Sequence, residues 1–263
     1  MQYIFMDDFA IYNGKKVDLR RKMTEISNGM KDIKEFEGMI SMPRFSQPVD
    51  ISNVPRTQTL ATYISKASTR IPDFEQTAFH DPFLIAYSSG TTGTPKCIVH
   101  SVGGATLSAA KEGKLHRGMA ADSVALQYTT TGWIMYFSSV MNLLAGSRVI
   151  LYDGSPFQPD LKTFVRMIGE QKVTKFGTSP RWMHELQKNG INPKEVTDLS
   201  NLKVVTSTGM VLSDQLFEWF YDSGFPAHIH LANIAGGTDL VSAVSFYQER
   251  MLTFNFRLAV LDR

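Results

Sequence analysis

A loop rich in hydroxyl side chains and closed by a lysine holds the residues of this sequence that are best suited to chemistry. It lies between two short apolar runs, residues 83–86 and 97–100, each of which predicts a strand. Its glycines tolerate backbone angles that are closed to other residues, so successive N–H groups can turn toward one point and bind an anion. The hydroxyls add donors and the lysine adds a positive charge, so the loop predicts a polyphosphate site. Its residues are Ser88, Ser89, Gly90, Thr91, Thr92, Gly93, Thr94, Pro95 and Lys96.

The loop differs from two better-known phosphate-binding patterns. It lacks the G-x-x-x-x-G-K-[ST] order of a Walker loop, because Thr94 and Pro95 separate Gly93 from Lys96. The chain also has no G-x-G-x-x-G, so the dinucleotide fingerprint is absent. The simpler interpretation is an ordinary connection between strands, rich in glycine, serine and threonine. Composition alone leaves both interpretations open.

The composition of the chain narrows its class. With 263 residues, 43% of them hydrophobic, the chain can build one large domain or two small ones. A net charge of +2 makes no case for nucleic acid as a partner. Cys97 is the single cysteine, and the longest apolar region, residues 134–152, is interrupted by Gly146 and Arg148, which argues against a membrane span. With no signal peptide in the sequence, we expect a cytoplasmic protein that contacts no membrane.

Apolar periodicity predicts helices and strands in regular alternation. A helical pattern begins at Leu19 and stops near Gly29, and three prolines mark a crossing loop before residue 58. Strands separated by helices of this length imply parallel sheets with both faces covered, and therefore an α/β, doubly wound fold. The expected later helices cover residues 60–67, 104–116, 134–144, 161–168, 180–189 and 213–220, and the expected strands cover residues 36–42, 83–86, 97–100, 124–128, 148–152, 173–176, 202–206 and 227–231.

Four segments with polar or glycine residues follow predicted strands. They are residues 88–96, 129–133, 207–211 and 233–239. In doubly wound sheets, ligands lie beyond the carboxyl ends of the strands. We therefore expect the four segments to form one composite site.

The last of these segments adds a candidate metal ligand. Asp239 supplies a hard oxygen of the kind that magnesium prefers, and this ion commonly takes one carboxylate together with phosphate oxygens. The plainer interpretations are a turn at Gly236 and Gly237 and a helix cap at Asp239. Beside a phosphate loop at the same predicted sheet edge, the metal-binding interpretation is favoured.

Two motifs of this chain resemble the signatures of the adenylate-forming ligases. Residues 88–96 match the first signature at all nine positions, a coincidence with odds on the order of 10⁻⁹, and residues 233–239 resemble the second. In that family the loop holds the β- and γ-phosphates of ATP, the threonine meets the nucleotide phosphate and the acidic residue holds magnesium. The resemblance thus implies catalytic roles for Lys96 and Thr238 and a metal-binding role for Asp239.

Within this family the chain looks most like the acetoacetate–CoA ligases. The similarity covers about residues 5–246. It implies ATP, Mg²⁺ and coenzyme A as cofactors, and a small carboxylate, acetoacetate first of all, as the partner. The implied reaction forms acyl-AMP and pyrophosphate, and then a thioester and AMP. The segments that carry this similarity are residues 12–15, 88–101, 128–133, 151–156 and 236–239.

The resemblance also assigns residues to the acyl and nucleotide pockets. Related acetyl-CoA synthetases carry a tryptophan at the position of Gly236, which shortens the acyl pocket, so glycine here implies a longer acid. Trp133 resembles the pocket tryptophan of the family, and a buried core tryptophan is an equally good interpretation. Gly209 and Met210 match a segment that lies along adenine, although the proline usual in the family is absent. Gly237 joins the residues that the resemblance places at the nucleotide.

The resemblance ends near residue 246. We therefore expect a partial adenylation domain over residues 1–246, a divergent tail over residues 247–263 and no C-terminal domain, so that the ribose-binding aspartate and the catalytic lysine of the family are missing. Three functions stay open: an acetoacetate–CoA ligase, a silent remnant that binds nucleotide or a protein, and a ligase for another short acid. Without the missing parts, we expect little or no thioester formation by this chain alone.

Overall fold

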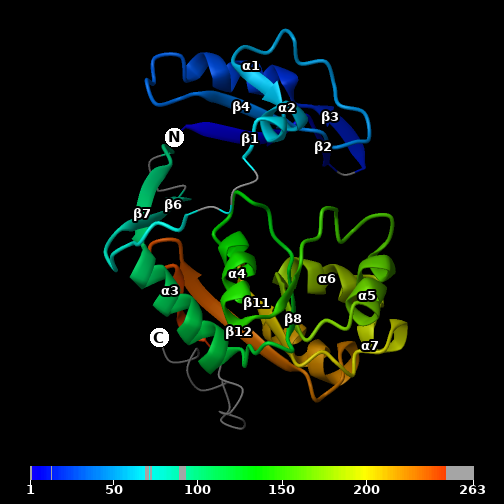
Figure 1. The fold of residues 1–263 in the computed structure, drawn as a ribbon. Coiled ribbons are helices and arrows are strands. Elements are labelled where there is room, and N and C mark those ends of the chain that lie inside the picture. Colours follow the sequence, from blue (N-terminus) through cyan, green and yellow to red (C-terminus); the bar gives the residue numbers. More distant parts are fainter. Residues whose placement is uncertain (1, 13, 69–70, 72, 89–92, 247–263) are drawn as a thin grey trace. The chain divides into compact units, whose positions relative to one another are not determined.

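The chain divides into two compact units, Met1–Glu75 and Gln76–Arg263 (Figure 1). Each unit buries a hydrophobic core of its own. The structure is a computed structural model, and it describes residues 2–12, 14–68, 71, 73–88 and 93–246.

The first unit is a small α/β layer. Its elements are β1 (Tyr3–Asp7), β2 (Phe9–Tyr12), β3 (Lys15–Asp18), α1 (Arg20–Gly29), β4 (Gly38–Met42), β5 (Thr57–Thr59) and α2 (Leu60–Ser65). β1, β4 and β5 form a parallel sheet in the order β1-β4-β5, and the buried side chains of Met23, Phe36, Met39 and Val54 form the core. The expected helix after Leu19 and the expected strand near residue 40 are confirmed. The hairpin of β2 and β3 was not expected, because β3 is exposed throughout and leaves no apolar pattern.

The second unit is built on a six-stranded sheet. Its strands are β8 (Val124–Gln127), β9 (Arg148–Ile150), β10 (Lys175–Thr178), β11 (Val204–Ser207), β12 (His230–Gly237) and β13 (Ser242–Phe246). They follow the order β13-β12-β11-β10-β8-β9. All neighbours pair parallel except β12 and β13, which pair antiparallel. The expected doubly wound parallel sheet is therefore confirmed.

Helices cover both faces of this sheet. They are α3 (Val102–Lys111), the π-helical turn η1 (Glu112–His116), α4 (Met135–Met141), the 3₁₀ turn η2 (Asn142–Ala145), α5 (Leu161–Glu170), α6 (Pro180–Lys188), α7 (Pro193–Val196), α8 (Asp214–Trp219) and the π-helical turn η3 (Phe220–Gly224). α3 and α4 lie on one side of the strands, and α5, α6 and α7 on the other (Figure 1). Asp160 and Ser213 accept backbone hydrogen bonds at the first turns of α5 and α8, which explains where these helices begin. In the core, Trp182 packs edge to face against Phe164 and Phe176.

None of the helices in the described part of the chain combines the length and the apolar character that crossing a bilayer requires. The expected cytoplasmic location stays a prediction. Part of the expected site lies outside the described residues, namely Ser89, Gly90, Thr91 and Thr92 of the loop and the expected tail at residues 247–263.

The last expected strand begins later and runs further than its apolar pattern indicates. We expected residues 227–231, whereas β12 runs from His230 to Gly237. Its parallel ladder with β11 ends at the pair Ser207–Asn233, and antiparallel pairing with β13 then carries the strand on to Gly237. The expectation that residues 233–237 form a loop beyond the strand is therefore wrong, because the hydrogen bonds of β13 hold them in the sheet.

The phosphate loop joins two strands that lie outside the six-stranded sheet. β6 (Pro82–Ser88) and β7 (Lys96–Ser101) pair as a separate two-stranded sheet. Both strands were expected, and their positions are confirmed. Their antiparallel pairing departs from the parallel sheets that the alternation implies, because the connection of residues 89–95 is too short for a parallel crossover.

Candidate functional site

A cavity of about 250 Å³ lies at the carboxyl ends of β8, β11 and β12. A single water needs roughly 10–15 Å³, so the cavity has room for a small organic ligand. Five residues that the sequence assigns to the site line it: Trp133, Gly209, Gly236, Gly237 and Thr238. The remaining wall comes mainly from α3, η1, α4 and the start of β13: Ala109, Glu112, Arg117, Gln127, Ile134, Met135, Phe137, Ser138, Met141, Thr206, Thr208, Ile234, Val241, Ser242 and Ala243.

Thr238 and Asp239 lie in the turn between β12 and β13. The carbonyl oxygen of Thr238 accepts a hydrogen bond of 2.8 Å from Nε2 of His100, near the end of β7. This bond ties the turn to the hairpin that carries the phosphate loop. Two segments that are far apart in the sequence, and that both predict phosphate binding, are thereby held to each other.

The hairpin of β12 and β13 is also fastened to α3 and η1. Oγ of Ser108 donates to the carbonyl oxygen of Val241 at 3.0 Å, and Nζ of Lys111 donates to Oγ of Ser242 at 2.9 Å. The carboxylate of Glu112 accepts hydrogen bonds from the hydroxyl of Ser242 and the backbone N–H of Ala243. These contacts fix the strand that closes one side of the cavity.

Gly236 lies where the backbone of β13 approaches β12 most closely. A Cβ at this position would lie 2.5 Å from the backbone oxygen of Ser242 and 3.1 Å from Cα of Ala243. The register of the ladder shifts at the same place, between Ala235 and Gly236. The resemblance explains this glycine by the length of the acyl pocket. The structure adds a second reason, because a side chain here requires the backbone of β13 to move.

Trp133 and Gly209 lie close together in the lining of the cavity. Gly209 has a φ of +89°, and a Cβ on it would lie 3.2 Å from Cη2 of Trp133. The indole is partly exposed, at 37%, and lines the cavity, so the alternative of a buried core tryptophan is less favoured. The hydroxyl of Thr208 donates to the carbonyl oxygen of Ile234 at 2.9 Å, which holds this segment against β12. The side chain of Met210 is 59% exposed and does not line the cavity.

The described ends of the phosphate loop lie opposite each other at the loop end of the hairpin. Ser88 and Lys96 are register partners in the ladder of β6 and β7. Gly93 has a φ of +80°, the left-handed conformation that glycine adopts freely. Thr94 and Lys96 are exposed, and none of these four residues is among those that line the cavity.

Asp239 is exposed, and its carboxylate is the candidate metal ligand. Within the described ranges, no group of three or more His, Cys, Asp or Glu side chains is placed to hold a metal ion. One carboxylate fits magnesium, which keeps several waters and shares substrate phosphates rather than occupying an all-protein cage. The donor chemistry at Asp239 therefore fits an ion that arrives with a polyphosphate, and the metal-binding role stays a proposal.

Sequence reasoning missed the polar wall of the cavity. Arg117 directly follows η1, and its Nη1 donates a hydrogen bond of 3.1 Å to Oγ of Ser138 on α4. Burial lowers the pKa of the Arg117 guanidinium, and the nearby charge of Glu112 opposes that shift. Gln127 and Thr206 are buried polar residues of the same wall. The available signal was the pair of opposite charges Glu112 and Arg117 near the end of an expected helix. The spacing of the two residues alone does not show that their side chains line a cavity.

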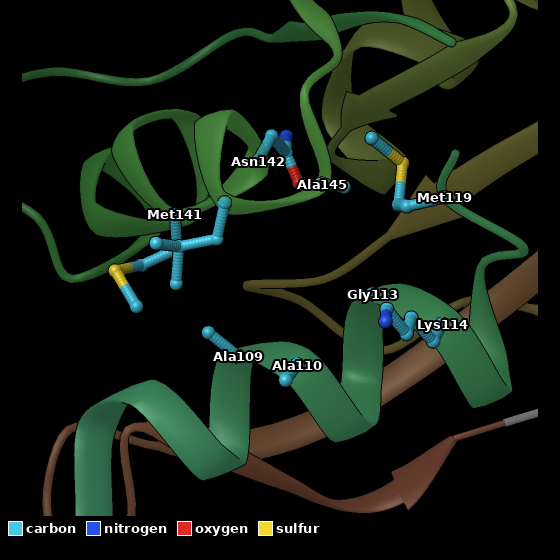
Figure 2. Close-up of a pocket in the computed structure, with 9 residues that line it drawn as sticks. Ala109, Ala110, Gly113, Lys114, Met119, Met141, Asn142 and Ala145 are labelled. Atoms are coloured by element: carbon cyan, nitrogen blue, oxygen red, sulfur yellow. The ribbon is translucent and has the colours of Figure 1, made fainter. Parts of the chain in front are cut away.

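A smaller cavity of about 30 Å³ lies between the helices (Figure 2). Its wall comes from α3 and η1, from α4 and η2, and from Met119 in the loop after η1. Ala109 and Met141 line both cavities. These two side chains therefore limit how far the larger cavity extends between the helices.

Fold and site together define a class: an α/β domain with a cavity at the carboxyl ends of its strands and a hairpin whose connecting sequence is rich in hydroxyls and ends in lysine. The chain belongs to the AMP-binding enzyme family, whose profile matches residues 19–254. The expected family is confirmed. The match covers most of both units and extends past residue 246, where we expected the resemblance to end.

The relatives of this chain include acetoacetyl-CoA synthetases. The enzyme of that name from Danio rerio is 36% identical over 243 residues, which cover 91% of this chain and 36% of that protein. The malonamoyl-CoA synthetase vrtB of Penicillium aethiopicum is 29% identical over 258 residues, covering 91% of this chain and 35% of that protein.

A solved structure also resembles this chain in fold and sequence. The acetoacetyl-CoA synthetase from Streptomyces lividans matches with a TM-score of 0.82 at 31% identity, over 94% of this chain and 37% of that chain. The chain thus spans little more than a third of the length of these relatives. Family and fold follow from these likenesses.

Proposed function

We propose that this chain provides the nucleotide- and acyl-binding part of an acid–CoA ligase that uses acetoacetate. The observation that carries the proposal is the cavity, which is lined by Trp133, Gly209, Gly236 and Thr238 from three separate segments of the chain. Membership of the AMP-binding enzyme family and the acetoacetyl-CoA synthetases among the relatives support the same function.

The proposed reaction has two steps. An oxygen of the acid's carboxylate attacks the α-phosphorus of ATP, forming acyl-AMP and releasing pyrophosphate. The thiol of coenzyme A then attacks the acyl carbon, which forms the thioester and releases AMP. Neither step requires a covalent bond to the protein, so catalysis depends on positioning and on neutralising charge.

The phosphate-binding roles fall on both hairpins. The loop of residues 88–96 holds the β- and γ-phosphates, and Lys96 offsets their negative charge. Thr238 contacts the α-phosphate, and His100 keeps the turn of Thr238 beside the loop through its 2.8 Å hydrogen bond. Magnesium, held by Asp239, supplies further charge neutralisation on the phosphates when it is bound.

The remaining roles concern adenine and the acid. Gly209 and Met210 lie along adenine, with Gly237 at the phosphate side, while Gly236 and Trp133 shape the acyl pocket. The names acetoacetyl and malonamoyl both denote acyl groups with a carbonyl on the third carbon. We therefore propose a short 3-oxo acid as the substrate class, and acetoacetate as its first member.

The proposal is tested by acid-dependent release of pyrophosphate from ATP. The purified chain with ATP and Mg²⁺ is given acetate, propionate, butyrate or acetoacetate, and hydroxylamine traps any acyl-AMP. We expect release that depends on the acid and is greatest with acetoacetate. ATP breakdown that is independent of the acid, or a folded chain that binds no nucleotide, contradicts the proposal.

A second candidate is a chain that binds ATP without activating an acid. It is favoured by the exposure of Lys96 and Asp239, neither of which lines the cavity. Saturable ATP binding with no pyrophosphate release for any acid would support this candidate. Release that is greatest with another acid of the panel would instead indicate a ligase for that acid.

A further inference from the structure

We propose that Arg117 selects 3-oxo acids, by donating hydrogen bonds from its guanidinium to the carbonyl oxygen on the third carbon of the acyl group. The inference rests on the proposed function, since it names a further residue of the same acyl pocket. Neither motif of the sequence includes Arg117, and it is the cavity that brings it to the site.

The charged side chains on the described wall of the cavity are Glu112 and Arg117. Glu112 already accepts hydrogen bonds from the hydroxyl of Ser242 and the N–H of Ala243, so its carboxylate is committed to holding β13. Arg117 is thus the charged group of this wall that is available to a ligand. A cation at this position favours an electron-rich acceptor such as a carbonyl oxygen.

The bonding of Arg117 within the protein is incomplete. A guanidinium carries five N–H donors in a fixed fork. Nη1 donates to Oγ of Ser138 at 3.1 Å, whereas the buried Nε has no hydrogen-bond partner in the described part of the chain. No described carboxylate lies within 4.0 Å of the guanidinium as an ion pair. Nε has almost no accessible surface, so it is closed to a ligand as well, and the donors left for a ligand in the cavity are those of Nη1 and Nη2. Nη2 makes no hydrogen bond among the described contacts.

The positions of Thr238 and Arg117 set the direction of the acid. The carboxylate has to meet the α-phosphorus of ATP, which we place at Thr238 on the turn after β12, while Arg117 follows η1 on another element of the same cavity. With its carboxylate at Thr238, a short acid extends into the cavity toward Arg117. An acid that lacks the 3-oxo group leaves the donors unpaired, and this is the arrangement by which polar pockets reject an analogue.

The test compares two non-acylating mimics of the acyl-adenylate, the 3-oxobutyl ester and the butyl ester of AMP, which differ in the carbonyl alone and are titrated at neutral pH. Calorimetric titration gives the Kd of each ester for the wild-type chain, Arg117→Leu and Arg117→Lys. We expect the wild type to prefer the 3-oxobutyl ester roughly 10- to 100-fold, the range for a hydrogen bond from a charged group. In Arg117→Leu the preference should vanish while the Kd of the butyl ester stays within about threefold. Arg117→Lys keeps the charge but loses the fork, so we expect part of the preference to remain.

Two further variants separate ligand recognition from a structural role. Ser138→Ala removes the hydrogen bond to α4 but keeps the guanidinium, so it should retain the preference, whereas a structural role predicts the same loss as in Arg117→Leu. Arg166→Leu, at an arginine on α5 that does not line the cavity, controls for loss of a positive charge. An equal loss for both esters in Arg117→Leu, or no preference in the wild type, overturns the inference. If the wild type binds AMP but shows no preference, the inference alone fails; if it binds neither AMP nor either ester, the proposed function fails with it.

Discussion

Gly236 shows how one residue can serve both the fold and the pocket. A methyl group at this position would clash with backbone atoms of Ser242 and Ala243. Backbone atoms in a strand cannot relieve such a clash by a rotamer change, as a flexible side chain can. At Gly237, the next residue, a Cβ would make only ordinary van der Waals contacts, with Oδ2 of Asp239 at 3.9 Å and the backbone nitrogen of Asp239 at 4.0 Å. The two neighbouring glycines therefore make a matched pair for substitution.

Gly236→Ala should lower the free energy of unfolding by about 1–3 kcal/mol, the range for forcing extra volume into a packed site. Gly237→Ala, the control, should change the free energy of unfolding by less than about 1 kcal/mol, because the added methyl group comes no closer to the backbone than 4.0 Å. Urea denaturation of both variants measures the difference. Equal effects of the two substitutions would contradict the close approach of β13 as the reason for glycine.

At the scale of elements, the position of β13 depends on η1. Glu112 accepts hydrogen bonds from the hydroxyl of Ser242 and the N–H of Ala243, and Lys111 donates to the same hydroxyl. Hydrogen bonds to a charged group contribute more than neutral ones. One carboxylate thus connects the turn that follows α3 to the strand that closes the cavity.

Glu112→Ala should lower the free energy of unfolding by about 1.5–3 kcal/mol, because it leaves the N–H of Ala243 without that acceptor. It should also speed hydrogen exchange at this N–H. Glu170→Ala, at an exposed glutamate at the end of α5, is the matched control and should change stability by less than about 0.5 kcal/mol. Unchanged exchange at Ala243 in the Glu112 variant would show that the carboxylate does not hold β13.

Most elements could be predicted because their signals are local. Ser179 and Pro180 mark the start of α6, Ser213 caps α8, and the apolar face that begins at Leu161 forms α5. The extent of β12 could not be predicted, because its second half depends on pairing with β13 and carries no apolar run of its own. Register and pairing partners depend on the rest of the sheet, and periodicity does not report them.

The residues of the site also separate into those with a local sequence signal and those that depend on the fold. The sequence pointed to Trp133, Gly236 and Thr238, which line one cavity. These residues belong to short motifs, whose residue types and spacing can be recognised in the sequence alone. It did not point to His100 or Arg117, whose importance depends on what lies opposite them in space. Single polar residues outside a motif give no signal until the fold brings them to a cavity.

At the scale of the whole molecule, the two units each carry a separate core. Ile40 in the first unit and Ile168 in the second are fully buried, so Ile40→Val and Ile168→Val remove the same methylene from different cores. Each should lower the free energy of unfolding by about 0.5–1.5 kcal/mol. Because units with separate cores need not unfold together, calorimetry should show two transitions, with one variant shifting each. One common transition that both variants lower equally would contradict independent units.

The central claim is that the hydroxyl-rich loop and the turn after β12 together bind the phosphates of ATP. Titration of the folded chain with magnesium-ATP tests this claim most directly, alongside a double variant, Lys96→Gln with Asp239→Asn, and a control, Lys188→Gln, at an exposed lysine of α6. We predict saturable binding by the wild type and the control, and at least roughly tenfold weaker binding by the double variant, because each substitution removes a charge that the proposed function assigns to the phosphates or their ion. A folded wild type that binds no magnesium-ATP, or a double variant that binds it as tightly as the wild type, would contradict the claim.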